Sequence, residues 1–245
     1  MSMKPRSAPR RFKFEYMRIP DIIIAVDGCS STGKSSFAKL VAKKFSFQYL
    51  DSGAMYRAVT LFAQESGLIS GDNTISDALR DALEGLDLHF GEGGTYIGER
   101  CVEKEIRTMT VSSQVSPIAA VPYVREYVDA RLHLFASEGR VVMDGRDIGT
   151  TVFPEAQLKI FMTATPQVRA QRRFDELKEK GQNPDFDAVL RNLQERDYID
   201  SHRDTSPLRR AEDSFELDNS GMSLEDELIW IEGLIRGRFT IYDED

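Results

Sequence analysis

The sequence predicts an α/β protein with a five-stranded parallel sheet covered by helices on both faces. Continuous apolar runs, typical of strands buried on both faces, occur at 21–27, 140–144 and 158–162. Stretches with helical spacing of apolar residues lie between such runs, and strands that alternate with helices form parallel sheets. The chain has 245 residues, which suits one large domain or a core domain with an insertion.

The predicted elements alternate along the chain. Strands are expected at 21–27, 48–50, 140–144, 158–162 and 215–218. Helices are expected directly after the first strand's glycine-rich loop, at 54–65, 71–84, 122–137 and 166–180, from a Gly-Gln-Asn-Pro break at 181–184 to about 200, and at 224–235.

One stretch departs from this alternation. Apolar segments at 86–90 and 95–97 flank a glycine-rich turn at 91–94, which is a β-hairpin signal. We therefore expect a small inserted subdomain at 72–116. The remaining divisions are a mobile basic extension at 1–20, core segments at 21–71, 117–165 and 185–245, and a short helical segment outside the core at 166–184.

Charge and composition limit the partners. The net charge of −8 argues against a broad basic face for a nucleic-acid polymer. No run of eighteen apolar residues is present, so no membrane-spanning helix is expected. Two cysteines cannot form a disulfide framework or a four-ligand zinc site, which suits a reducing compartment. We expect a cytoplasmic monomer whose partners are small molecules.

Residues 28–35 read G-C-S-S-T-G-K-S and match the phosphate-binding pattern G-x-x-x-x-G-K-[ST]. Glycines let the loop wrap closely around phosphate, and the backbone N–H groups at the start of the following helix attract anions. Lys34 would reach the β- and γ-phosphates of a nucleotide, and Ser35 would contact Mg²⁺. The residues expected to hold the nucleotide are Gly28, Cys29, Ser30, Ser31, Thr32, Gly33, Lys34, Ser35 and Ser36.

Two further motifs follow predicted strands. In D-S-G-A-M-Y-R at 51–57, Arg57 would hold a second phosphate, while Ser52 is also a natural helix cap. The strand at 141–144 ends in Asp144, which resembles the aspartate that orients Mg²⁺ in phosphate-binding proteins. Arg146 and Asp147 then lie at the carboxyl edge of the sheet, where such folds bind ligands, although a surface ion pair is an alternative.

A third motif, E-R-D-Y-I-D-S-H-R, occupies 195–203. Arg196, Asp200 and Arg203 share one helix face. Glu195 and Asp197 are expected on other faces, so both arginines would stay under-neutralised and available to a phosphate. An exposed, salt-bridged helix is the alternative interpretation.

The fourth arginine-rich segment is P-Q-V-R-A-Q-R-R at 166–173. Arg169, Arg172 and Arg173 could clamp a transferring phosphate from a mobile lid. A solvated helix face is a serious rival for each of these arginines.

Together with E-I-R-T at 105–108 and P-Y-V-R-E at 122–126, these motifs resemble the bacterial cytidylate kinase family over residues 21–236. The resemblance implies a P-loop kinase fold with an inserted subdomain that binds the nucleoside monophosphate and a short helical lid at 166–184. It also implies transfer of a phosphoryl group from ATP to CMP and dCMP with Mg²⁺.

The resemblance also implies residue roles. Lys34, Arg146, Arg172 and Arg196 would act in catalysis, Arg172 and Arg173 would cover ATP, and Ser35 and Asp144 would bind the metal. CMP would be held by Ser52, Tyr56, Arg57, Arg107, Arg125, Arg146, Asp147, Arg196, Asp200 and Arg203. Within that set, we expect Arg125 and Asp200 nearest the base, assisted by Ser52, and Asp147 nearer the sugar.

This sequence departs from the family pattern in the loop. Cys29 stands where proline is common, and Ser35-Ser36 stands where Gly-Thr is common, which leaves open which hydroxyl meets Mg²⁺. The alternatives are a P-loop kinase for another acceptor, such as another nucleoside monophosphate, shikimate or dephospho-coenzyme A, and a nucleotide-dependent switch module. A Ras-like GTPase would need an Asn-Lys-x-Asp stretch, which the sequence lacks.

Overall fold

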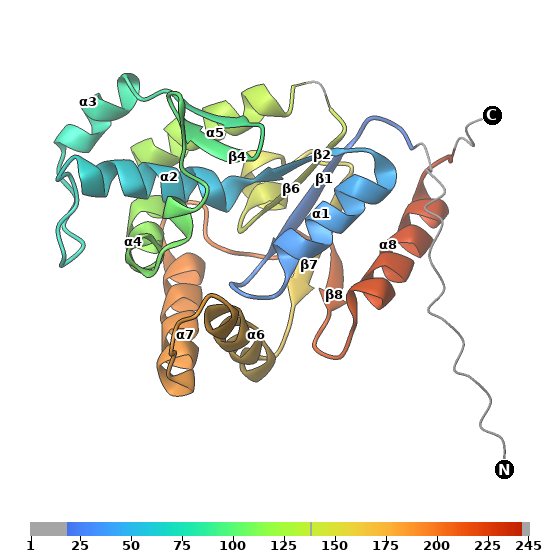
Figure 1. Ribbon diagram of the computed structural model, residues 1–245. Coiled ribbons are helices and arrows are strands. Elements are labelled where there is room, and N and C mark those ends of the chain that lie inside the picture. Colours follow the sequence, from blue (N-terminus) through green and yellow to red (C-terminus); the bar gives the residue numbers. More distant parts are fainter. Residues whose placement is uncertain (1–18, 138, 242–245) are drawn as a thin grey trace, which may run out of the picture.

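The computed structural model describes residues 19–137 and 139–241 (Figure 1). Most of the predicted extension at 1–20 lies outside the described residues. Its last part does not behave as an extension, because Ile19 is 1% exposed and packs into the core. The folded core therefore begins before the predicted boundary.

A five-stranded parallel sheet forms the centre of the molecule, as the sequence predicts, with the order β2-β6-β1-β7-β8. Its strands are β1 (Ile23–Gly28), β2 (Gln48–Asp51), β6 (Val141–Gly145), β7 (Leu158–Thr163) and β8 (Phe215–Asp218). Alternate residues of each strand point to opposite faces, so β1 places Ile24 and Val26 in one core and Ala25 in the other.

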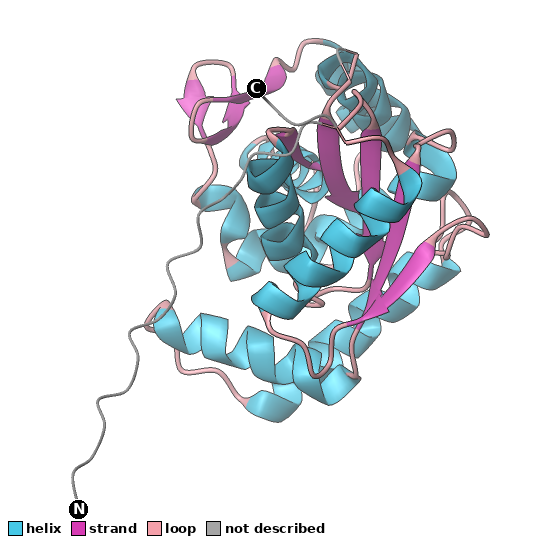
Figure 2. Cartoon of the chain, turned by 90° about the vertical axis from the view of Figure 1, so that its right-hand side faces the viewer, coloured by secondary structure: helices cyan, strands magenta, loops and turns pink. Residues whose placement is uncertain are grey.

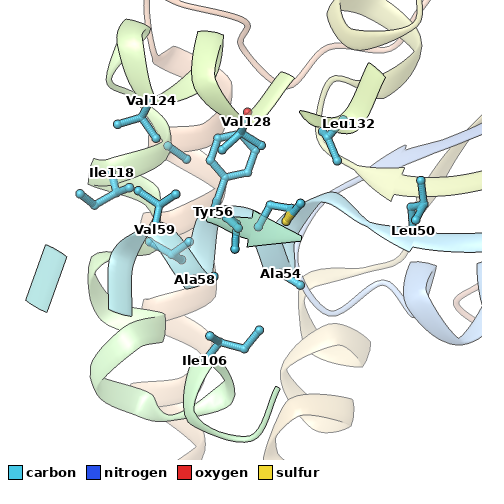
Figure 3. Packing of buried hydrophobic residues seen from close by; sticks show 14 of the residues in the cluster. Leu50, Ala54, Tyr56, Ala58, Val59, Ile106, Ile118, Val124, Val128 and Leu132 are labelled. Carbon is cyan, nitrogen blue, oxygen red and sulfur yellow. The ribbon is translucent and has the colours of Figure 1, made fainter. Parts of the chain in front are cut away.

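Helices cover both faces of this sheet, and Figure 2 shows the strands between them. The main helices are α1 (Lys34–Phe45), α2 (Ser52–Glu65), α4 (Met109–Ala119), α5 (Pro122–Phe135), α6 (Pro166–Glu179), α7 (Phe186–His202) and α8 (Leu224–Arg238). Helices α1 and α8 pack on one face, and α2, α4 and α5 on the other. The hydrophobic core between the sheet and α2, α4 and α5 is called the second core below. Figure 3 shows this core around α2, where Tyr56 lies among Val124, Val128 and Val59.

The predicted hairpin is present, with β3 (Leu88–Gly91) antiparallel to β4 (Gly94–Ile97). A third short strand, β5 (Arg100–Cys101), was not predicted, since two residues carry no periodicity. The helix predicted at 71–84 is wrong in its first half: α3 spans only Ala78–Glu84. Residue Ile75 instead forms a β-bridge with Ile69, which uses the backbone groups that a helix would need.

Helix α4 was also not predicted. Its sequence is rich in Ser and Thr and contains Pro117, a combination more typical of turns than of helices. Tertiary packing decides the outcome, because Val111 and Ile118 are buried against the rest of the second core. The predicted subdomain boundary at 116 falls inside this helix.

Helices α6 and α7 form a hairpin with a small core of their own, made by Ala170, Leu177, Val189 and Leu193. In Figure 1 this pair stands below the sheet and beside α4. A compact helical pair with a separate core suits a unit that moves as one body. Among residues 19–137 and 139–241, no helix has both the length and the apolar character required to cross a membrane.

Candidate active site

A cavity of about 360 Å³ opens where the carboxyl ends of β1, β2 and β6 meet α4, α6 and α7. It gathers most of the residues that the sequence singled out. These are Ser30, Ser31, Gly33, Lys34, Ser35, Ser36, Ser52, Tyr56, Arg57, Arg107, Arg125, Asp144, Arg146, Asp147, Arg173, Arg196, Asp200 and Arg203. Segments more than 170 residues apart in sequence therefore line one space.

Five predicted residues do not line the cavity: Gly28, Cys29, Thr32, Arg169 and Arg172. Gly28 has φ 146°, and a Cβ there would lie 2.1 Å from the Met162 carbonyl oxygen, so only glycine fits. The Cys29 carbonyl accepts a hydrogen bond from Lys34 Nζ. On the other side of the loop, the Thr32 carbonyl accepts a hydrogen bond from Arg172 Nη1. The predicted contact of Arg172 with ATP stays a prediction.

The loop between β1 and α1 is built to receive an anion. Helix α1 begins after Gly33 (φ 93°), and within the described chain no side chain caps its first N–H groups. These groups and the positive end of the helix dipole are therefore available to a phosphate. Lys34 lies beside them, 5% exposed, with its Nζ 2.6 Å from the Cys29 carbonyl oxygen. Burial, with Arg146 nearby, lowers the pKa of Lys34 to about 7.

A pair of hard oxygen ligands faces this loop. The Ser35 hydroxyl donates to Asp144 Oδ2 at 2.9 Å, and the Tyr49 hydroxyl donates to Asp144 Oδ1 at 2.7 Å. Burial raises the pKa of Asp144 to about 6, and Asp51, its neighbour across the sheet, adds to the shift. Mg²⁺ is commonly held by one or two carboxylates together with phosphate oxygens and water, so these residues fit it. Among the described residues no three or more His, Cys, Asp or Glu side chains are arranged so that they could hold a metal ion by themselves.

Several arginines of the cavity are neutralised by acids. Arg146 Nε lies 2.9 Å from Asp200 Oδ2. Asp147 binds Arg125 through one oxygen and Arg203 through the other, the latter at 3.1 Å, and all three side chains are buried. The structure thus pairs Arg125 with Asp147, whereas Asp200 pairs with Arg146.

Arg203 corrects one expectation. It was predicted to be under-neutralised on the same helix face as Arg196, but it caps the end of α7 with an extended backbone (ψ 145°). Its guanidinium leaves the helix, donates to the Ser206 carbonyl at 2.5 Å and pairs with Asp147. The acid that neutralises it comes from a different element, which helix geometry alone could not show.

Within residues 19–137 and 139–241, Arg57 and Arg196 form no ion pair. Arg57 donates only to the Ser112 hydroxyl and the Ile106 carbonyl, and Arg196 Nε is buried without a hydrogen-bond partner. Burial, reinforced by the charge of Arg196, lowers the pKa of Arg57 to about 9. Burial, reinforced by the charge of Arg146, lowers the pKa of Arg196 to about 10. Two such guanidiniums in one cavity form a site for a multiply charged anion.

Two acidic residues that support the site, although neither lines the cavity, were missed. Asp27 is the next-to-last residue of β1. Its carboxylate accepts hydrogen bonds from the backbone N–H groups of Ile148 and Gly149 at 2.8 and 2.7 Å, and these bonds fix the turn after β6. Burial raises the pKa of Asp27 to about 7. Its place at the end of an apolar strand was a usable signal. Asp197 binds Arg169 at 2.5 Å, and this contact between α6 and α7 had no signal in the sequence.

Comparison with known proteins agrees with this geometry. The cytidylate kinase family model matches residues 24–232. A cytidylate kinase of Bacteroides thetaiotaomicron is 52% identical over 216 residues, covering 86% of this chain and 94% of that protein. The cytidylate kinases of Bacteroides fragilis and Flavobacterium johnsoniae are 48% and 49% identical, covering 86% and 84% of this chain and 94% and 92% of those proteins.

The strand–loop–helix phosphate site, the arginines opposite it and this similarity over most of the chain lead to one conclusion: the chain belongs to the cytidylate kinase family.

Proposed function

We propose that this protein transfers the γ-phosphoryl group of ATP to CMP and dCMP, which yields ADP and CDP or dCDP. The observation that carries the proposal is that Arg57 and Arg196, which form no ion pair within the described residues, lie in the same cavity as the phosphate-binding loop. Two anions held in one cavity can meet in line, and the family relationship names the cytidine nucleotide as acceptor.

The donor half of the site is the loop. The N–H groups that begin α1 would bind the phosphates of ATP, and Lys34 would move from the Cys29 carbonyl onto the β- and γ-phosphates. Ser35 and Asp144 would hold Mg²⁺, which neutralises phosphate charge when it is bound. The bond between these two side chains favours Ser35 over Ser36 as the ligand.

The acceptor half is the arginine set. Arg57 and Arg196 would bind the phosphate of CMP, and Arg146 would lie between the two reacting phosphates because it contacts Ser30 of the loop. We place the cytosine at the buried Arg125–Asp147 pair, and the sugar near Asp200, which lies closer to the loop through Arg146. This reverses the roles that we first expected for the two aspartates.

No general base is needed, because a phosphate acceptor is largely ionised at neutral pH. The protein must instead hold both anions in line and keep water from the γ-phosphorus, since water would hydrolyse ATP. We assign the exclusion of water to the α6–α7 pair, with Arg173 facing the cavity. The free thiols of Cys29 and Cys101 support action in the reducing cytoplasm, and we propose that the monomer is active.

The test is to identify the products. Incubation of the protein with ATP, Mg²⁺ and CMP should give ADP and CDP in equal amounts, separated by anion-exchange chromatography. Lys34→Ala should lower the rate by several orders of magnitude while circular dichroism shows an unchanged fold, because an electrostatic contact at the transition state is lost. ADP without CDP would refute the proposed transfer.

A further inference from the structure

The carbonyl of Thr32, in the middle of the phosphate-binding loop, is held from outside the cavity. Its oxygen accepts from Asn219 Nδ2 at 2.8 Å and from Arg172 Nη1 at 3.0 Å. Ser31 and Gly33 line the cavity, whereas Thr32, Asn219 and Arg172 are not among the described residues that line it. Both donors therefore approach the loop from the side opposite to the phosphate site.

This contact sets the direction of an N–H group. The peptide group is planar and trans, so its C=O and N–H point in opposite directions. Because the Thr32 carbonyl points outward, the N–H of Gly33 in the same peptide points toward the cavity. Gly33 precedes the first turn of α1, and its N–H belongs to the group that would bind the phosphates of ATP.

Asn219 is fixed in one orientation. Besides Thr32, its Nδ2 donates to Glu227 Oε1 at 2.6 Å, and its Oδ1 accepts from Arg172 Nη1 at 3.0 Å. A flipped amide would place Oδ1 against two other oxygens and its NH₂ group against a guanidinium. Asn219 is 1% exposed, so water cannot relieve such contacts.

Glu227 has no other described role. It lies in the first turn of α8 and is 3% exposed, and its buried Oε2 has no hydrogen-bond partner in the part of the chain that the structure describes. A buried carboxylate with an unpartnered oxygen costs stability. Its one hydrogen bond is the one that orients the Asn219 amide.

We propose that Asn219 and Glu227 are positioning residues for ATP. Glu227 orients the Asn219 amide, and Asn219 together with Arg172 keeps the Thr32 carbonyl turned outward, so that the loop is formed before the nucleotide arrives. Arg172 belongs to α6, so its hydrogen bond to the Thr32 carbonyl also joins the loop to the α6–α7 pair. The inference rests on the proposed function for the identity of the nucleotide.

The test separates this role from simple stabilisation. In Asn219→Asp combined with Glu227→Gln, the new amide can donate to the new carboxylate, so the buried pair is satisfied again. Thr32 nevertheless loses the N–H that Asn219 supplied. Because a carboxylate oxygen then faces the Thr32 carbonyl oxygen, we expect the melting temperature to fall by a few degrees. In the folded protein we expect about tenfold weaker ATP binding by calorimetry, the size of one lost hydrogen bond. The KM for CMP should stay unchanged.

A second variant covers the case in which the double variant does not fold. Glu227→Met removes the buried carboxylate with its unpartnered oxygen and leaves the Thr32 carbonyl as the remaining acceptor of Asn219 Nδ2. It should weaken ATP binding by a few fold, since the Asn219 amide loses its restraint. Wild-type ATP affinity in either folded variant would overturn the proposal.

The matched control is Ser223→Ala on the same helix. The Ser223 hydroxyl caps α8 by accepting from the Asp226 N–H at 3.2 Å and does not contact Asn219. This variant should lower the melting temperature and leave ATP affinity unchanged, and an equal loss of ATP affinity would contradict the positioning role. Because ATP binding is measured without an acceptor, failure to phosphorylate CMP would refute the proposed function separately.

Discussion

Arg146 Nη2 donates a 2.8 Å hydrogen bond to the hydroxyl of Ser30 in the phosphate-binding loop. The Nε of the same guanidinium binds Asp200 of α7 at 2.9 Å. The Arg146 side chain thus joins the phosphate-binding loop to α7, the helix that carries Arg196, which we propose binds the phosphate of CMP. The planar guanidinium makes both contacts in a fixed geometry, which lysine cannot reproduce.

Arg146→Lys should therefore lower kcat by about a hundredfold, since the charge remains but the alignment of the two phosphates is lost. The melting temperature should fall by only a few degrees. Steady-state kinetics with ATP and CMP measure this change, and Arg131→Lys, on α5 away from the cavity, is the control. A kcat within about twofold of the wild type would show that Arg146 does not align the reactants.

Binding of ATP should take up a proton at Lys34. The pKa of this lysine in the free protein is lowered from 10.5 to about 7, first by burial. Bound phosphate favours the charged form of Lys34 and raises its pKa again. At a pH between the pKa of Lys34 in the free protein and its pKa in the complex, the complex therefore holds more protons than the free protein. The γ-phosphate of ATP is already ionised at alkaline pH, so it contributes little to the number of protons taken up on binding.

The measurement is calorimetry of ATP binding at about pH 8.5 in two buffers with different ionisation enthalpies. The apparent enthalpies should differ in proportion to the proton taken up. Lys34→Arg stays charged in both states and should show no difference. Equal enthalpies for the wild type in the two buffers would argue that Lys34 is already charged before ATP binds.

Arg196 and Arg203 should respond differently to replacement by alanine. Arg196 forms no ion pair among residues 19–137 and 139–241, and its Nε has no hydrogen-bond partner there, so Arg196→Ala should leave the melting temperature nearly unchanged. It should reduce kcat/KM for CMP by two to three orders of magnitude, about 3–4 kcal/mol. Arg203→Ala, in contrast, should lower the melting temperature, because the buried Asp147 carboxylate loses one of its two arginine partners.

Melting curves and CMP kinetics of the two variants provide the comparison. If Arg196→Ala kept wild-type kinetics, the phosphate site assigned to it would be wrong. If Arg203→Ala kept the wild-type melting temperature, its pairing with Asp147 would contribute nothing to stability.

Local signals in the sequence predicted much of the fold. The five strands of the large sheet and the loop at 28–35 follow from apolar runs and from glycine spacing, which act over a few residues. Helix α4 and strand β5 did not follow, because α4 depends on packing against distant residues and β5 on pairing with β4. The same limit applies to the site, since the partners Asp147 and Arg203 are 56 residues apart.

The Tyr49 hydroxyl should affect the metal requirement. It donates to Asp144 Oδ1 while Ser35 donates to Oδ2, so it helps to fix the carboxylate that would meet Mg²⁺. Tyr49→Phe should raise the Mg²⁺ concentration for half-maximal rate by several fold and weaken Mn²⁺ binding in the presence of ADP, measured by electron paramagnetic resonance.

The matched control for this variant is Tyr127→Phe. Its hydroxyl donates to the Leu86 carbonyl at 2.7 Å and does not contact the cavity. The control should keep the wild-type metal dependence. Unchanged metal dependence in Tyr49→Phe, with the two variants equally stable, would remove Tyr49 from the metal site.

The choice of acceptor tests the function most directly. The buried Arg125–Asp147 pair, with Ser52 close to Gly145, offers a polar edge of fixed shape, and a purine would leave these groups unpaired or would not fit. The decisive measurement is kcat/KM in a coupled assay of ADP release with CMP, dCMP, UMP, AMP, GMP, shikimate and dephospho-coenzyme A. CMP and dCMP should both be phosphorylated, and each should exceed AMP and GMP by at least about a hundredfold. ADP release stimulated by AMP or shikimate, but by neither CMP nor dCMP, would contradict the assignment.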